Sequence, residues 1–199
     1  QPSRFLDWRA HGLVDLAGAL ARSSNVYFYV IGGGCMRAGC EEVGKNKGLG
    51  IEKLYEYLQF FGFDAITDID IPGETVGFLP RPENKLQRTG EPWRVGDTYN
   101  VSIGQGDMGV TPIRLLTFFS SLANNGIMMK PRFLLDEPSS ILMDYTGWSE
   151  EIRAVRQGLR DAVAKNYGTA NLVYDVLYRS AGKTGSAQLA NNTKTNAFF

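Results

Sequence analysis

Apolar residues recur at helical spacing in several segments of this chain, and strand-like sequence lies at its end. A spacing of three or four residues predicts amphipathic helices, whereas short runs around a polar turn predict a hairpin. The last two runs, residues 181–190 and 194–199, are expected to form a hairpin around the turn Asn191-Asn192-Thr193. The expected helices cover residues 13–21, 26–31, 51–61, 113–123 and 149–165. Helices first and a hairpin last favour an α+β fold over alternating βαβ units.

Helix boundaries are marked most clearly at residues 113–123. Thr111 is a good N-cap, and Pro112 suits the first helical position. Between residues 63 and 95, proline and glycine recur and no long periodic segment survives. We therefore expect an irregular connection there, with short strands near residues 75–78.

The charge balance gives no support to polyanionic partners. Lys plus Arg number 21 and Asp plus Glu also number 21, so the formal net charge is zero. A neutral chain gives no electrostatic reason to bind nucleic acid or an acidic membrane surface. The 43% of hydrophobic residues among 199 positions is typical of one domain with a packed core. No apolar run approaches the roughly 20 residues that a membrane-spanning helix needs.

Two cysteines, Cys35 and Cys40, lie in a glycine-rich stretch, and the only histidine is His11. A structural zinc site needs four ligands, so this set does not predict a metal site. A disulfide between the two cysteines and a pair of free thiols are both compatible with their spacing.

The tetrapeptide Lys183-Thr184-Gly185-Ser186 opens the expected hairpin with groups suited to binding an anion. Lys183 supplies a positive charge, and Thr184 and Ser186 supply hydroxyls. Gly185 lets a ligand lie against the backbone without a Cβ in the way. Such a strand edge can bind an extended peptide and its terminal carboxylate, but a solvated edge strand has a similar composition.

A second polar group, Ser23-Ser24-Asn25, separates the first two expected helices. Alone, such a turn is usually a helix cap. Its order relative to Lys183-Thr184-Gly185 is informative, because serine acyl-transfer enzymes use S-x-x-K, then S-x-N, then K-T-G. The second and third of these elements are present here in that order.

Three segments together resemble the high-molecular-weight class B penicillin-binding proteins, and among them the elongation type. They are residues 19–29 (ALARSSNVYFY), 99–106 (YNVSIGQG) and 182–188 (GKTGSAQ). The resemblance covers nearly the whole chain. It implies the transpeptidase fold shared by penicillin-binding proteins and serine β-lactamases, of which residues 1–199 would be the C-terminal portion of one domain. The portion would contain the helical subdomain and part of the antiparallel sheet.

The resemblance assigns catalytic roles to three side chains. Ser23 would lie beside the nucleophile and help pass a proton to the leaving group. Asn25 would hold the amide of the donor peptide and the general-base lysine. Lys183 would support the electrostatics and the proton path.

Substrate binding is implied for the strand that follows. Thr184 and Ser186 would grip the substrate carboxylate, with Gly185 between them, and the backbone N–H of Ser186 would form half of an oxyanion hole. The stretch Gly104-Gln105-Gly106 would support the cleft without reacting.

The nucleophile of that family does not appear in this chain. The family needs a serine one helical turn before a lysine, well upstream of the S-x-N turn. The only S-x-x-K spacing is Ser180-Ala181-Gly182-Lys183, which shares its lysine with the expected strand, and we interpret it as coincidence. We therefore expect the isolated chain to be inactive and not to fold stably without its missing segments.

The expected function is part of a peptidoglycan D,D-transpeptidase that acts through a serine acyl-enzyme and binds β-lactams. An inactive remnant that binds peptidoglycan or a partner is the alternative, and a β-lactamase or β-lactam sensor fits less well. The implied partners are stem peptides, β-lactams, a SEDS-family glycosyltransferase and elongation proteins, without nucleic acid, metal or organic cofactor. The implied location is periplasmic or extracytoplasmic, with a membrane anchor outside this chain.

Overall fold

A computed structural model of the chain describes residues 5–35, 47–136, 138–175, 177–189 and 194–199. The chain divides into two compact units. Unit 1 comprises Gln1–Leu49, Val95–Gln105 and Ala154–Phe199, and unit 2 comprises Gly50–Arg94 and Gly106–Arg153. Each unit is therefore assembled from segments that are distant in the sequence.

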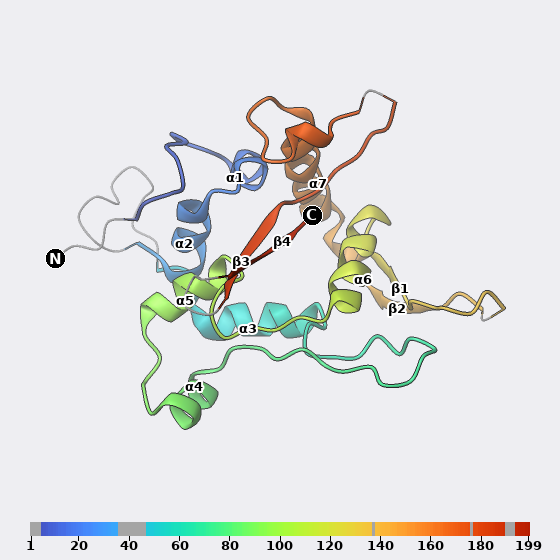
Figure 1. The fold of residues 1–199 in the computed structure, drawn as a ribbon, viewed down its shortest axis with the longest axis horizontal. Helices are drawn as coiled ribbons and strands as arrows, with labels where there is room; N and C mark the ends of the chain where they lie inside the picture. Colours follow the sequence, from blue (N-terminus) through green and yellow to red (C-terminus); the bar gives the residue numbers. More distant parts are fainter. Residues whose placement is uncertain (1–4, 36–46, 137, 176, 190–193) are drawn as a thin grey trace. The chain divides into compact units, whose positions relative to one another are not determined.

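Unit 1 contains helices and one hairpin (Figure 1). Helix α2 packs on α5, and Gly33 lies so close to the Tyr99 ring that a Cβ there would be 2.1 Å from Tyr99 Cε1. A side chain at position 33 would therefore separate the two helices. The elements of this unit are α1 (Leu16–Arg22), α2 (Asn25–Gly33), α5 (Val95–Ser102), most of α7 (Ser149–Ala164), the 3-10 turn η2 (Asn171–Val173), β3 (Gly185–Leu189) and β4 (Lys194–Phe198).

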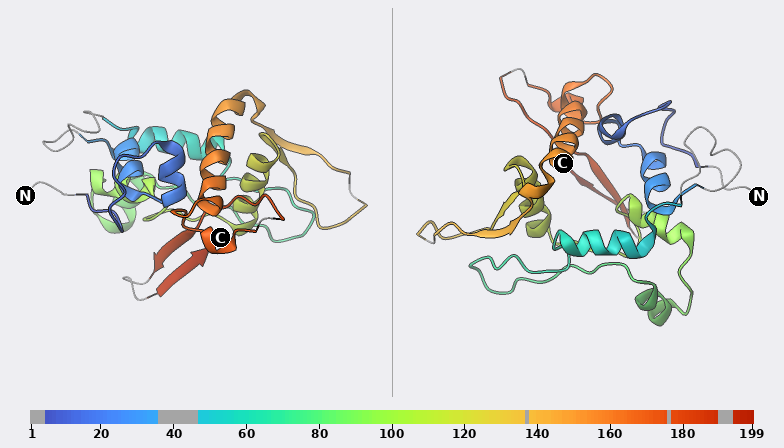
Figure 2. Two further views of the ribbon diagram at one scale, coloured as in Figure 1. Left: turned by 90° about the horizontal axis from the view of Figure 1, so that it is seen from above. Right: turned by 180° about the vertical axis from the view of Figure 1, so that it is seen from behind.

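The hairpin of unit 1 pairs β3 and β4 antiparallel (Figure 2). Gly185 pairs with Phe198, and Ser186 pairs with Ala197. The Phe199 ring covers Gly182, where a Cβ would come within 2.7 Å of the ring. The predicted hairpin is confirmed, whereas its predicted turn at 191–193 lies outside the described residues.

Unit 2 contains three complete helices and a short antiparallel pair. Strand β1 pairs with β2, with Met128 opposite Met143. The elements of this unit are α3 (Gly50–Phe60), α4 (Pro82–Thr89), α6 (Pro112–Ala123), β1 (Ile127–Met129), β2 (Ile141–Asp144), the 3-10 turn η1 (Thr146–Trp148) and the first turn of α7.

An arginine in α6 organises the core of unit 2. Arg114 is 2% exposed, and its guanidinium donates to the carbonyl oxygens of Ala65 and Ile66. These bonds give the buried guanidinium hydrogen-bond acceptors, which a buried charged group needs. Burial lowers the pKa of the Arg114 guanidinium. The same unit also contains a cluster of aromatic rings made of Phe60, Phe61, Phe118, Tyr145 and Trp148.

The predicted α+β class is confirmed by these helices and antiparallel pairs. Helix α6 starts where Thr111 and Pro112 predict, and the Thr111 hydroxyl accepts from the N–H of Arg114. The first predicted helix starts too early, because the Asp15 side chain caps α1 through the N–H of Gly18 and the helix begins at Leu16.

The prediction of an irregular connection over residues 63–95 is wrong in part, because helix α4 lies within it. Pro82 occupies its first turn, and Gly90 ends it in the left-handed region at φ 74°. This helix has no buried residue. Its sequence, PENKLQRT, therefore lacks the regularly spaced apolar residues that indicate a helix. Near the predicted strand at 75–78, the structure has a single bridge between Phe78 and Gly109.

Two further observations concern membrane-spanning helices and the cysteines. No helix in the described ranges is both long and apolar enough to cross a membrane. Cys35 is disulfide-bonded, and Cys40 lies outside the described residues.

Candidate active site

The turn between α1 and α2 brings the first group of predicted site residues to one place. Helix α1 ends at Arg22, and Ser23 adopts the left-handed conformation with φ 55° and ψ 47°. Ser24 is the N-cap of α2, and its hydroxyl accepts from the N–H of Tyr27. Asn25 is then the first residue of α2. A left-handed serine costs backbone energy, and such strain is concentrated at functional sites.

Asp7 holds the α2 side of this turn. Its carboxylate accepts from the Ser24 hydroxyl at 2.6 Å and from the backbone N–H groups of Asn25 and Val26 at 3.2 and 3.3 Å. A carboxylate at a helix N-terminus satisfies unpaired amides and interacts favourably with the helix dipole. Burial would raise the pKa of Asp7, but the hydrogen bonds from Ser24 and the backbone outweigh it and lower the pKa.

The next residue, Trp8, holds the α1 side. Its indole N–H donates to the carbonyl oxygens of Arg22 and Ser23, both at 3.2 Å. Helix C-termini leave carbonyls unpaired, so this donor satisfies the end of α1. Asp7 and Trp8 therefore fix both sides of the Ser23-Ser24-Asn25 turn.

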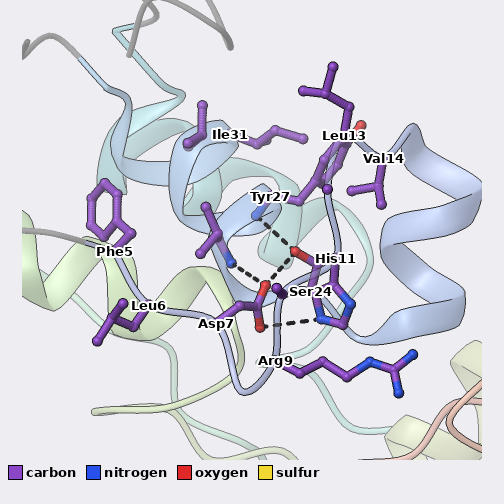
Figure 3. A pocket seen from close by; sticks show the side chains of 14 residues that line it. Phe5, Leu6, Asp7, Arg9, His11, Leu13, Val14, Ser24, Tyr27 and Ile31 are labelled. Carbon is purple, nitrogen blue, oxygen red and sulfur yellow. Dashed lines mark hydrogen bonds and ion pairs between the residues drawn. The ribbon is translucent and has the colours of Figure 1, made fainter. Parts of the chain in front are cut away.

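A cavity of about 620 Å³ lies beside the turn, lined by apolar side chains and by Asp7, His11 and Ser24 (Figure 3). The His11 side chain is 3% exposed, and its Nε2 lies 3.7 Å from Asp7 Oδ1. Within the part of the chain that the structure describes, neither ring nitrogen of His11 has a hydrogen-bond partner.

Lys183 joins this turn from the other end of the sequence. Its Nζ donates to Ser23 Oγ at 2.8 Å and to the carbonyl oxygen of Thr184 at 2.7 Å. Burial lowers the pKa of the Lys183 amine. An ammonium group has three donors, so one remains after these two bonds. Lys183 is therefore fixed beside Ser23 with one N–H still available.

The segment around Lys183 is anchored at several points. Gly182 N–H donates to the Leu159 carbonyl at 3.1 Å, and Arg160 donates to the Ser180 carbonyl at 2.6 Å. Both anchors lie on α7, so this helix sets the approach of the strand.

Gln105 anchors β3 itself. Its side-chain amide donates to the Ser186 carbonyl at 2.8 Å. This contact gives Gln105 a direct structural connection to the predicted substrate-binding strand. Gln105 lies in the stretch that the sequence predicts to support the cleft.

A smaller cavity of about 210 Å³ lies between the turn and Lys183. Its lining combines hydroxyls, an amide and an amine with apolar side chains: Leu20, Ser23, Ser24, Asn25, Phe28, Ser102, Ile103 and Lys183. The Ser102 hydroxyl donates to the Thr98 carbonyl at 2.7 Å. A buried amine next to a hydroxyl can move a proton, and a nearby amide can orient a peptide group.

The predicted substrate-binding residues follow Lys183 along the chain. Thr184 is half-buried, Gly185 begins β3, and Ser186 is exposed. The three residues directly follow Lys183 in the sequence, but the lining of the 210 Å³ cavity does not include any of them.

Ser180, the serine of the S-x-x-K spacing, has a different environment from Ser23. Ser180 lies outside any helix, and its hydroxyl is buried without a partner among the described residues. Lys183 donates to Ser23 rather than to Ser180. The geometry therefore favours the interpretation that Ser180-x-x-Lys183 is a coincidental spacing.

Three contributors were missed from the sequence: Asp7, Trp8 and Thr169. Asp7 and Trp8 precede the first helix in a stretch without apolar periodicity. The only sequence feature that could have indicated their role is the acidic side chain of Asp7 upstream of a helix cap. Thr169 lies in the turn after α7, and its Oγ1 accepts from Thr184 Oγ1 at 2.8 Å. In the ranges that the structure describes, no group of three His, Cys, Asp or Glu side chains could hold a metal ion.

Comparison with known proteins identifies the family of this chain. The family model described as "Penicillin binding protein transpeptidase domain" matches residues 1–199. The peptidoglycan D,D-transpeptidase MrdA of Haemophilus influenzae is 33% identical over 97% of this chain and 30% of its own length. MrdA of Acinetobacter baumannii is 30% identical over 94% of the chain and 27% of its own length. The chain thus spans less than a third of these relatives.

Solved structures show the same fold. The penicillin-binding protein PBP2 from Helicobacter pylori superposes with a TM-score of 0.80 at 30% identity, over 98% of this chain and 35% of that one. PBP2 from Pseudomonas aeruginosa superposes with a TM-score of 0.70 at 27% identity, over 95% of this chain and 42% of that one. With the family model matching from end to end, this chain belongs to the penicillin-binding protein transpeptidase domain family.

Proposed function

We propose that the chain is the C-terminal portion of one transpeptidase domain, and that the protein containing it cross-links peptidoglycan stem peptides. The observation that supports this most is the hydrogen bond of 2.8 Å from Lys183 Nζ to Ser23 Oγ. It places an amine of lowered pKa beside a hydroxyl, in a cavity that Asn25 also lines. The relatives named peptidoglycan D,D-transpeptidase support the same reaction.

The proposed reaction is acyl transfer through a serine ester. A serine hydroxyl attacks the carbonyl of the penultimate D-Ala of a donor stem, and the terminal D-Ala leaves with a proton on its amine. An amine of a neighbouring stem then attacks the ester, forms the cross-link and returns the proton to serine. A β-lactam acylates the same serine through opening of its ring. We expect this nucleophile in an S-x-x-K helix outside the 199 residues.

The side chains of this chain would position the substrate and move the proton. Ser23 would pass the proton to the departing amine, with Lys183 as its hydrogen-bond partner. A lowered pKa suits this role, because an amine that loses its proton more easily exchanges it at a smaller cost. Asn25 would bind the donor amide, and Thr184, Gly185 and Ser186 would bind the terminal carboxylate.

We further propose that the site works outside the cytoplasmic membrane, with a SEDS-family glycosyltransferase and elongation proteins as partners. PBP2 from Helicobacter pylori, solved in complex with MreC, superposes on this chain with a TM-score of 0.79 at 30% identity. That complex supports an elongation assembly as the setting.

Intact-mass measurement after incubation with a β-lactam tests the proposal. The full-length protein should gain the mass of one β-lactam, and peptide mapping should place it on a serine outside these 199 residues. The isolated 199-residue chain should gain none. A full-length protein without an adduct would favour the inactive, peptidoglycan-binding alternative. An adduct on the isolated chain would show that the nucleophile lies within it.

A further inference from the structure

Thr184 and Thr169 share one hydrogen bond, although each hydroxyl carries a proton. Their Oγ1 atoms lie 2.8 Å apart. Among the residues that the structure describes, neither hydroxyl shows a second hydrogen-bond partner. Two protons and one mutual bond leave one proton available for another acceptor, and hydroxyl rotation decides which residue keeps it.

The position of Thr169 is fixed by its backbone. Its N–H donates to the Ala21 carbonyl at 3.1 Å, next to the end of α1. The preceding Gly168 packs so tightly that a Cβ there would be 2.1 Å from the Ala162 carbonyl oxygen. The following N–H, of Ala170, donates to the same carbonyl at 3.0 Å. Thr169 Oγ1 is therefore held beside the strand by contacts that do not involve a ligand.

The direction of the Thr184–Thr169 bond controls what Thr184 can offer. When Thr184 donates to Thr169, its only hydroxyl proton is used in that bond. The Thr184 oxygen can then only accept a hydrogen bond from a ligand. A carboxylate is an acceptor, so it gains nothing from lone pairs. When Thr169 donates instead, the Thr184 proton is free to bind a carboxylate. The reversal requires the rotation of two hydroxyl groups and no movement of the backbone.

We infer that Thr169 is a positioning residue that selects ligands with a free terminal carboxylate, by donating its proton to Thr184 so that Thr184 donates to the ligand. The inference rests on the proposed function, in which Thr184 contacts that carboxylate. A hydroxyl that accepts one hydrogen bond is polarised and becomes a better donor for the next. Ligands whose terminus is an ester need this donor less, because an ester carbonyl is a weaker acceptor than a carboxylate.

The test compares a β-lactam acid with its methyl ester in the full-length protein. Thr169→Val keeps the β-branched shape and removes the hydroxyl, whereas Thr169→Ser keeps the hydroxyl. Thr169→Val should slow acylation by the acid about 3- to 10-fold, the effect of one hydrogen bond, and slow the ester less than about 2-fold. Thr169→Ser should retain the wild-type ratio of the two rates. Both rates scale with the folded fraction, so their ratio is independent of stability.

A second comparison uses Thr184→Val as background. If Thr169 acts through the Thr184 hydroxyl, adding Thr169→Val should leave the acid-to-ester ratio unchanged there. Equal slowing of both ligands by Thr169→Val, or no change in either, would overturn the inference. A wild-type protein that neither ligand acylates would overturn the proposed function, and this inference with it.

Discussion

Lys183 Nζ donates a hydrogen bond of 2.8 Å to Ser23 Oγ, although 160 positions separate the two residues. The bond connects the end of α1 with the segment that leads into β3. Asp7 and Trp8 hold the Ser23 side, and Gln105 and α7 hold the Lys183 side. The pair is thus supported from both ends, and such support fixes the relative position of the two side chains.

The first prediction concerns the pH dependence of stability. Burial lowers the pKa of Lys183 below its usual 10.5. Between the lowered pKa and 10.5 the unfolded chain binds more protons than the folded chain, so Lys183 makes the free energy of unfolding rise with pH. Lys183→Met removes this contribution. Denaturant titrations across the window should therefore show a shallower rise for Lys183→Met, and equal slopes would contradict the burial effect.

Asp7 should also make the free energy of unfolding rise with pH, but in the acid range. Its pKa is lowered below 3.8, so its contribution is complete above pH 3.8 and is lost as the pH falls through the lowered pKa. At neutral pH, Asp7→Asn should reduce the free energy of unfolding by about 1.5–3 kcal/mol, the range for hydrogen bonds to a charged group. The difference in the free energy of unfolding between Asp7→Asn and wild type should become smaller as the pH falls below 3.8.

Asp15 provides the matched control for Asp7. It also caps a helix, because its Oδ1 accepts from the Gly18 N–H at 2.7 Å, but it does not contact the turn. Asp15→Asn should cost less than about 1 kcal/mol and leave β-lactam acylation unchanged. Asp7→Asn should slow acylation as well. Equal acylation by the two variants would show that Asp7 supports stability alone.

Ser23 should tolerate glycine better than alanine. Its φ of 55° lies in the left-handed region, which costs an L-residue roughly 1–2 kcal/mol and glycine almost nothing. Both substitutions remove the hydroxyl that Lys183 contacts. Thermal unfolding should rank Ser23→Gly above Ser23→Ala, while acylation falls in both. The reverse order of stability would mean that the left-handed conformation is not maintained in solution.

Gly168 and Gly96 should respond oppositely to alanine. A Cβ at Gly168 would lie 2.1 Å from the Ala162 carbonyl oxygen, whereas nothing lies within 4 Å of one at Gly96. Gly168→Ala should destabilise by about 1–3 kcal/mol, as overpacking does, and should displace Thr169. Gly96→Ala, in α5, should stabilise by about 0.4–1 kcal/mol. Urea unfolding of the two variants measures the sign of each change in the free energy of unfolding.

Sequence reasoning could predict the β3–β4 hairpin and helices α1, α2, α3, α6 and α7, but neither α4 nor α5. Helix α6, with a cap at Thr111 and a proline at position 112, was recovered almost to the residue. Helix α4 was not, because its eight residues bury nothing and only Pro82 and Gly90 mark its ends. Strand β2, four residues long, has no buried residue either.

From the sequence, only the family resemblance connects Ser23, Asn25 and Lys183, because no periodicity relates residues 160 positions apart. The structure places the three around one cavity, and their catalytic roles stay predictions. Asp7 and Thr169 act through single hydrogen bonds from irregular segments. Such contacts depend on where the folded backbone places two loops, and local sequence carries no signal for that.

The most direct test of the central claim, that Ser23 and Lys183 work as one unit in acyl transfer, is a double-mutant cycle. The second-order rate constant of β-lactam acylation would be measured in the full-length protein for wild type, Ser23→Ala, Lys183→Met and the double variant. Each single change should slow acylation about 10²- to 10⁴-fold, and the double variant should be about as slow as the slower single one. The claim would be contradicted if the double variant lost rate by the product of the two single-variant factors. It would also be contradicted if Ser23→Ala were acylated at the wild-type rate.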